Sequence, residues 1–223
     1  MDIDMQNKTE YISPVSLWLV VRKVFHHKGL FVEPAWAGDA ELSGPAIFVS
    51  RMLAEVYAQL RNTYYAKDDS NNWKVIPLHE FNLLEHAHGI DGPMNCMMTF
   101  GFGMEDAESV ICIHCPRLRM VPLPFTIPRE IEGITFSFNQ GAFDFMREEW
   151  ASIGLPEFEK ELESTDEMDA ATFDRWFQTA IARLKVCRAP VMGHEGPWAV
   201  FSMLRDMWVT GNEIPAMTDR SLH

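Results

Sequence analysis

The hydrophobic positions near the start of the chain follow a helical period. Apolar residues recur at steps of three or four after Ser13-Pro14, a dipeptide typical of helix starts, and Gly29 provides a stop. This spacing predicts a helix over about residues 14–28. Ser43-Gly44-Pro45 repeats the opening, and the apolar stripe after it predicts a second helix. The first stripe consists of Val15, Trp18, Val21, Val24 and Phe25.

Between about residues 95 and 138 the hydrophobic period changes from 3.6 to 2, as in Met98, Phe100 and Phe102. This alternation predicts a short antiparallel sheet. Three prolines follow, and a proline cannot donate a hydrogen bond to a strand ladder. We therefore expect residues 122–130 to form an edge strand or a connecting loop; the prolines are Pro122, Pro124 and Pro128.

The helical period returns after Gln140 and ends at Gly154, which predicts a helix over this segment. Apolar residues at helical spacing from Pro197 to Gly211 predict another helix at the end of the chain. No internal repeat interrupts these elements.

Ser164 and Glu167 have the spacing of a capping box, and the apolar face after them predicts a helix over about residues 166–186. Together the patterns indicate a single α+β domain over residues 1–223. In it, a short antiparallel sheet at about residues 95–138 is packed by about five amphipathic helices.

The charge of the chain narrows the range of partners. Its 19 basic and 32 acidic side chains give a net charge of −13, and affinity for phosphate backbones comes mainly from Lys and Arg. We therefore expect no direct binding of nucleic acid. Residues 157–174 hold eight of the acidic side chains and one basic one.

Four glutamates alternate with other residues at the start of this acidic segment. They are either a solvated surface or a docking surface for a basic protein, because exposed charges of one sign steer the approach of the opposite sign. The candidate partner-binding residues here are Glu157, Glu159, Glu161 and Glu163.

A second candidate for partner binding is the loop at residues 192–198. Glycines on both sides let it present His194, Glu195 and Trp198 near the start of the predicted last helix. The alternative interpretation is a plain turn capped by Gly196.

The cysteines and the other clustered histidines predict no metal and no cofactor. Cys112 and Cys115 follow a β-branched run rather than opening a helix, and no second cysteine pair completes a zinc site. We expect them to be structural thiols. On a helix, His79 and His86 would lie too far apart to bind one metal ion, and His86 and His88 would point in different directions. Histidines just before Gly89 suit the negative end of a helix dipole.

Three further features predict a cytosolic protein without a membrane segment. The apolar run at residues 17–21 is far shorter than the roughly 20 residues that cross a bilayer. The first four residues, Met-Asp-Ile-Asp, lack the positive charge of a secretory signal. Four cysteines in 223 residues suit a reducing compartment.

These observations favour an acidic, cytosolic protein-binding protein rather than an enzyme, such as a bacterial immunity, antitoxin or inhibitor protein that covers a surface of its partner. No catalytic residue is predicted. One alternative is a small hydrolase that assembles histidines and carboxylates from separate segments. Another is a structural subunit of a larger assembly, to which the 14 methionines would contribute adaptable contacts.

Overall fold

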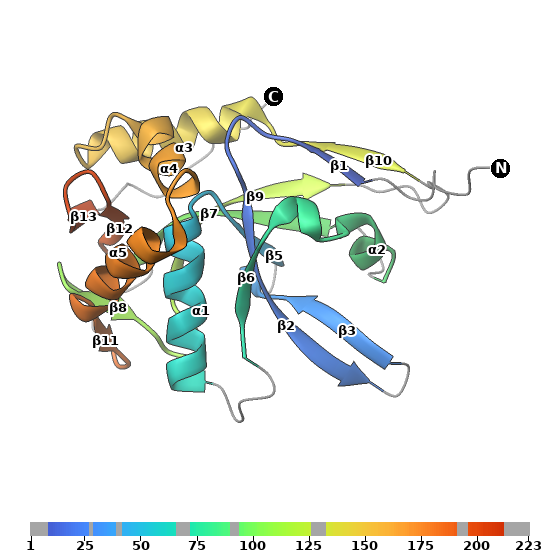
Figure 1. Ribbon diagram of the computed structural model, residues 1–223, viewed down its shortest axis with the longest axis horizontal. Coiled ribbons are helices and arrows are strands. Elements are labelled where there is room, and N and C mark those ends of the chain that lie inside the picture. Colours follow the sequence, from blue (N-terminus) through green and yellow to red (C-terminus); the bar gives the residue numbers. More distant parts are fainter. Residues whose placement is uncertain are drawn as a thin grey trace.

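A computed structural model of the chain describes residues 9–26, 29–38, 42–65, 72–89, 94–125, 133–190 and 196–211. The described part is mixed α/β, with 34% of it helical and 41% in strands. The predicted short antiparallel sheet packed by helices is therefore wrong: strands from both ends of the chain join the central ones in a single large mixed sheet (Figure 1).

The main sheet of the described chain has nine strands, six of which follow one path in the order β13-β12-β7-β5-β2-β3. β5 and β7 are parallel neighbours, whereas β2 runs antiparallel to β5, and β12 to β7. Off this path, β4 pairs with β5, β6 with β2 and β9 with β7. Two further parallel pairs, β1–β10 and β8–β11, form separate two-stranded sheets. The strands are β1 (Thr9–Ile12), β2 (Trp18–His26), β3 (Gly29–Pro34), β4 (Trp36–Gly38), β5 (Ser43–Phe48), β6 (Lys74–Pro77), β7 (Met94–Gly103), β8 (Ser109–Ile111), β9 (Leu118–Phe125), β10 (Ile134–Ser137), β11 (Lys185–Cys187), β12 (Trp198–Ser202) and β13 (Met207–Gly211).

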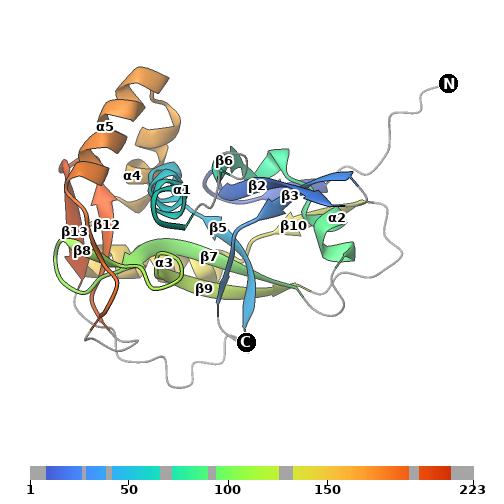
Figure 2. The ribbon, with the colours of Figure 1, turned by 90° about the horizontal axis from the view of Figure 1, so that it is seen from below.

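The sheet separates two hydrophobic cores. In β2, Leu19 and Val21 enter one core and Val20 enters the other, as the pleat of a strand requires. The first core includes apolar residues of α2 (Leu83–His88), α3 (Gln140–Ser152) and α4 (Phe158–Asp166). The second core includes those of α1 (Arg51–Tyr65) and α5 (Ala170–Ala182). Figure 2 shows α1 and α5 on one face of the sheet and α3 on the other.

The central strand β7 changes face along its length. Its ladder with β9 shifts register between Thr99 and Gly101, and a bulge of this kind turns the following side chains over. Phe100 therefore lies in the first core and Phe102 in the second. The simple alternation predicted one face for both residues, but β7 is buried on both sides.

The predicted helix over residues 14–28 is wrong, because this segment contains β2. Residues 18–21 are apolar without interruption, which is the pattern of a strand buried on both faces. β-branched valines favour that conformation, and β2 pairs with β3, β5 and β6. The second predicted helix is correct only from Arg51, since residues 43–48 form β5.

The predicted helix from Pro197 to Gly211 is also wrong, because this segment is the β12–β13 hairpin. Both strands are largely buried, so their apolar residues carry no clear period. A turn at residues 203–206 joins the strands, and its last residue, Asp206, adopts a positive φ of 52°. Asp is among the residues that tolerate this conformation.

The predicted helix over about 166–186 corresponds to α5 (Ala170–Ala182), which begins later than predicted and follows a separate helix, α4 (Phe158–Asp166), that the sequence patterns did not predict. Ser164 lies inside α4, where its hydroxyl donates to the Glu161 carbonyl at 2.8 Å. The N-cap of α5 is Asp169, whose carboxylate accepts from the Thr172 amide at 2.9 Å. The helix beginning at Gln140 is confirmed as α3.

The prolines of β9 behave as the sequence predicts. Pro122 and Pro124 lie in β9, and among the described strands β9 pairs only with β7. A proline has no backbone N–H to donate, and a strand at the edge of a sheet tolerates this because it has a neighbour on one side only. Pro128 lies outside the described residues. None of the described helices combines the length and apolarity needed to span a bilayer.

Candidate functional site

The alternating glutamates of residues 157–163 lie at the start of α4, so a period of two distributes them around a helix rather than along one face. Glu157 is the N-cap residue and pairs with Lys160 at 2.7 Å. Both side chains are exposed, and such a pair contributes little to stability.

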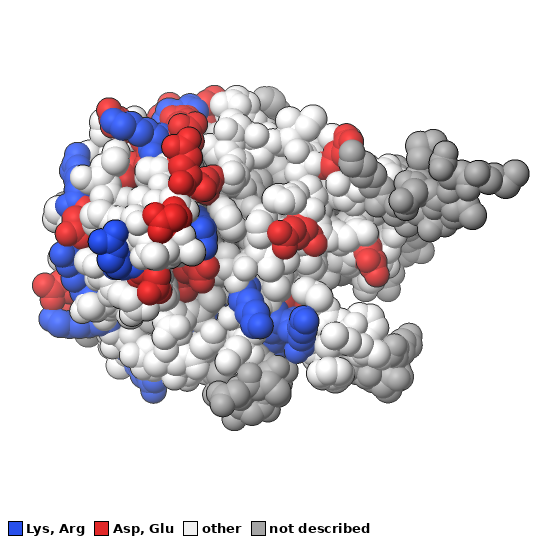
Figure 3. Space-filling model, viewed as in Figure 1, with Lys and Arg blue, Asp and Glu red and all other residues white. Residues whose placement is uncertain are grey.

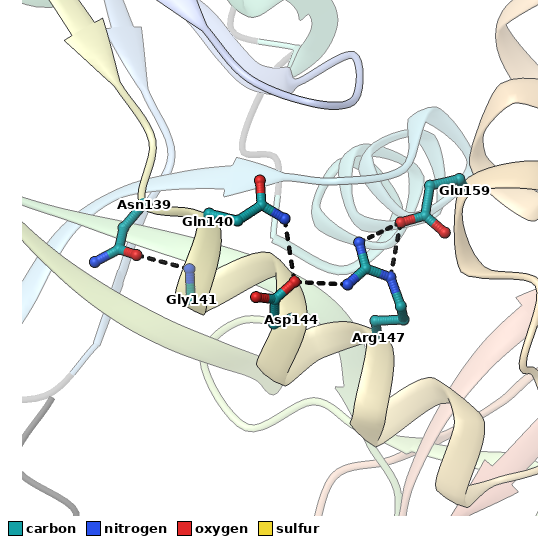
Figure 4. Close-up of polar contacts among 6 residues, drawn as sticks. All are labelled: Asn139, Gln140, Gly141, Asp144, Arg147 and Glu159. Atoms are coloured by element: carbon teal, nitrogen blue, oxygen red, sulfur yellow. Dashed lines mark hydrogen bonds and ion pairs between the residues drawn. The ribbon is translucent and has the colours of Figure 1, made fainter.

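Glu159 is held by an arginine of the preceding helix. The Arg147 guanidinium donates to Glu159 Oε1, with its Nε at 2.8 Å, and also to Asp144 Oδ1 at 2.6 Å (Figure 4). These hydrogen bonds hold the pKa of the Glu159 and Asp144 carboxyls below their usual range. Glu159 therefore connects α4 to α3.

Glu161 is buried and binds the β12–β13 turn. Its Oε1 accepts from the Ser202 hydroxyl at 2.5 Å, and its Oε2 accepts from the Met203 amide at 3.1 Å and the Leu204 amide at 3.4 Å. A buried carboxylate requires such donors. This side chain is not available to a partner in the folded protein.

Glu163 is exposed and lies beyond Glu161 on α4. The four predicted glutamates thus have separate environments, and the structure does not bring them together as one surface. Figure 3 shows acidic groups gathered over the part of the molecule that contains α4 and α5.

The predicted loop at residues 192–198 is described only from Gly196. His194 and Glu195 lie outside the described residues. Trp198 is 2% exposed and packs edge-to-face on Phe100, with ring centroids 5.5 Å apart. A Cβ on Gly101 would lie 2.6 Å from the Trp198 ring, so Trp198 is a core residue.

The predicted structural cysteines are free thiols. Cys112 is buried in the second core, and burial raises its pKa to about 12. Cys115 is partly buried. In the described part of the chain, no three His, Cys, Asp or Glu residues are placed to hold a metal ion.

His86 and His88 occupy the last turn of α2, directly before its C-cap Gly89, as predicted. His86 packs against Trp36 and Phe81, with ring centroids 6.1 and 5.7 Å away. Burial lowers the pKa of His86, and the charge of Glu33 acts in the opposite direction. His79 lies apart, in the short 3₁₀ turn Leu78–Glu80.

The most unusual surface feature is a hairpin that the sequence patterns did not predict. β2 and β3 project from the body as a two-stranded arm, which we define as residues 21–26 and 29–34 (Figure 1). Large apolar side chains are exposed on both faces of its outer half: Phe25 (79%), Leu30 (49%), Phe31 (46%) and Val32 (44%). Exposed apolar groups clustered in this way mark interaction surfaces.

The arm could have been found from the sequence. Two apolar, β-branched runs flank His27-Lys28-Gly29, and a short polar segment containing glycine between such runs is a hairpin signal. The helical interpretation of residues 14–28 concealed it. No protein-family model, curated protein or solved structure matches the chain.

Proposed function

We propose that the protein acts by binding another protein and covering a surface of it, as immunity, antitoxin and inhibitor proteins do, and that the arm is its contact element. The observation that supports this is the exposure of Phe25, Leu30 and Val32. Burying an exposed leucine or phenylalanine yields about 1.5–3 kcal/mol. A few such side chains usually dominate the energy of an interface.

The arm's own structure suits this role. Arg22 and Glu33 pair across it at 2.7 Å, and the Arg22 guanidinium lies 4.8 Å from the Trp73 ring centre. These contacts hold the base of the hairpin against the body. Its outer half can then present side chains with little further loss of conformational freedom on binding.

The partner we infer is a protein with an apolar groove that receives the arm and a basic surface that faces the acidic body, rather than a nucleic acid. The net charge of −13 supports this choice, because exposed acidic groups accelerate encounter with a basic surface. Exposed carboxylates such as Glu157 and Glu163 belong to this steering field rather than to the contact itself. The free thiols support the inference of a reducing, cytosolic location.

The experiment is site-specific photo-crosslinking in the cells that make the protein, with a photoreactive phenylalanine analogue at position 25. We expect a covalent adduct with another protein that is lost in Leu30→Ser. The matched control is Leu204→Ser, because Leu204 is also 49% exposed but lies in the β12–β13 turn, on the other side of the molecule (Figure 1). Equal adduct yields in the two variants, or no adduct with another protein, would contradict the proposal.

A further inference from the structure

The last turn of α2 packs against the chain just beyond the base of the arm. Trp36 lies there, in β4, and its indole is edge-on to the His86 imidazole, with ring centroids 6.1 Å apart. The Phe81 ring contacts the same imidazole, at 5.7 Å. His86 therefore connects α2 to the point where the arm leaves the sheet.

The backbone at this point is fixed, whereas the Trp36 side chain is not enclosed. The fully buried Ala35 links the arm to Trp36. Its amide donates to the Val20 carbonyl at 2.7 Å, and its carbonyl accepts from the Ala46 amide at 2.8 Å. Trp36 itself is 40% exposed. The ring contact with His86 is therefore the part of this junction that can open while the sheet stays intact.

The surroundings of His86 suit a neutral imidazole. Its Nε2 atom is buried and has no hydrogen-bond partner, and burial lowers its pKa below the ordinary value of 6.5. Protonation places an N–H on both ring nitrogens. Nε2 would then be a buried charged donor without an acceptor, which costs free energy.

The charged groups around His86 offer it one acceptor, and that acceptor is out of reach. Glu33 of the arm is the described charge that acts on the imidazole, and its carboxylate is held by Arg22 Nε at 2.7 Å. Because Nε2 has no partner in this packing, an imidazolium must leave the ring contacts or draw Glu33 toward itself. Four titratable residues of the adjoining elements are exposed and do not contribute to the shift: His79, Glu80, Glu85 and His88.

We propose that His86 is a pH-sensitive support of the arm: the neutral imidazole holds Trp36 and the base of the arm in place, and protonation releases them. The inference rests on the proposed function, because it takes the arm as the contact element, and it adds the regulation of that element. A released arm must be ordered again on binding, and this ordering weakens the complex. Binding is therefore strong at neutral pH and falls as the pH drops below the ordinary range of histidine.

The first test follows Trp36 by fluorine NMR of the full chain labelled with fluorotryptophan. Trp36→Phe identifies its resonance among those of the seven tryptophans. As the pH is lowered from about 8 to about 5.5, across the titration range of histidine, we expect this resonance to move toward that of a fully exposed indole. The resonance of Trp150, which is 2% exposed, should stay in place and show that the fold is intact.

Two variants of α2 show whether His86 causes the change. His86→Gln carries an uncharged side chain at every pH, so its Trp36 resonance should not move. His88→Gln, at an exposed position of the same helix, should keep the wild-type titration. A wild-type Trp36 resonance that does not respond to pH, or one that moves equally in His86→Gln, would overturn the proposal.

The second test measures binding through the adduct formed at position 25, in extracts of the same cells adjusted to about pH 7.5 and about pH 5.5. We expect the wild-type yield to fall about twofold or more at the lower pH, because protonated His86 no longer supports the arm. In His86→Gln the yield should change less. Equal losses in the two proteins would assign the pH dependence to other groups and overturn the proposal.

These results separate the inference from the proposed function. A Trp36 resonance that titrates only when His86 is present, in a protein that forms no adduct, would support the role of His86 and contradict the binding function. An adduct that is lost in Leu30→Ser, but depends on pH equally in wild type and His86→Gln, would overturn the role of His86 and leave the binding function standing.

Discussion

Glu161 connects two segments that are 41 residues apart, because its carboxylate binds both the Ser202 hydroxyl and the backbone of the β12–β13 turn. Its sequence context gives no sign of this role. It stands in an alternation with three other glutamates, and only the packing of α4 against the hairpin distinguishes it from its exposed neighbours.

Glu161→Ala should lower the free energy of unfolding by about 2–4 kcal/mol, because it leaves buried donors of the turn without an acceptor. Glu163→Ala, an exposed change on the same helix, should stay within about 0.5 kcal/mol of the wild type. Urea unfolding measures both. Similar losses in the two variants would show that the turn does not depend on the Glu161 carboxylate.

His86 should make the stability of the protein depend on pH. Its pKa in the folded state lies below the ordinary value of 6.5 because of burial, so the unfolded chain binds the proton more tightly. Neutral His86 makes its full contribution to the free energy of unfolding above about pH 6.5. This contribution is lost as the pH falls from there to the folded-state pKa.

His86→Gln should therefore flatten the rise of unfolding free energy with pH between about 5 and 7. His88→Gln, at an exposed position of the same helix, should keep the wild-type slope. Urea unfolding at several pH values gives the comparison. A slope that is unchanged in His86→Gln would refute the assignment.

The approach of β5 to β7 depends on a glycine. A Cβ on Gly44 would lie 1.8 Å from the Asn95 carbonyl oxygen and 2.7 Å from its carbon, both of which are backbone atoms. The two strands could not keep their present spacing around a side chain at this position. Gly44 thus marks close contact between strands rather than the start of a helix, which its neighbours Ser43 and Pro45 suggested.

Gly44→Ala should cost about 3 kcal/mol or more, at the upper end of overpacking effects. Gly89→Ala is the control, since Gly89 has a helical φ of −80° and a Cβ there would meet only the His86 carbonyl oxygen, at 3.3 Å. Thermal unfolding should show it unchanged or slightly stabilised. A tolerated Gly44→Ala would mean that β5 and β7 are less closely packed than described.

The sequence pattern predicts the type of an element that has one buried face, but it does not distinguish a helix from a strand that is buried on both faces. α3 has its N-cap Asn139 and an apolar stripe in the sequence, and it was predicted correctly. β2 and β12 are buried on both sides, so their apolar residues are nearly continuous and fit a helix equally well. The start of α5 was predicted too early because Ser164 as well as Asp169 can serve as an N-cap.

At the scale of the whole molecule, the large sheet could not be predicted because its neighbours are distant in sequence. β12 pairs with β7 from about 100 residues away, and β13 joins the sheet through β12. Local periodicity contains no information on the pairing of β12 with β7. The candidate contact surface was missed for a different reason. Its two strands are consecutive in the sequence, and the helical interpretation of residues 14–28 concealed the hairpin signal between them.

The pairing of β1 with β10 sets an order of events during synthesis. Thr9 aligns with Ile134, and the Tyr11 hydroxyl donates to the Phe81 carbonyl at 2.5 Å and accepts from the Leu83 amide at 3.1 Å. At about 5–20 residues per second, a ribosome needs roughly 6–25 s to make the chain between the two strands. During that time β1 has no β10 to pair with. The β1–β10 ladder can therefore form only after more than half of the described chain has left the ribosome.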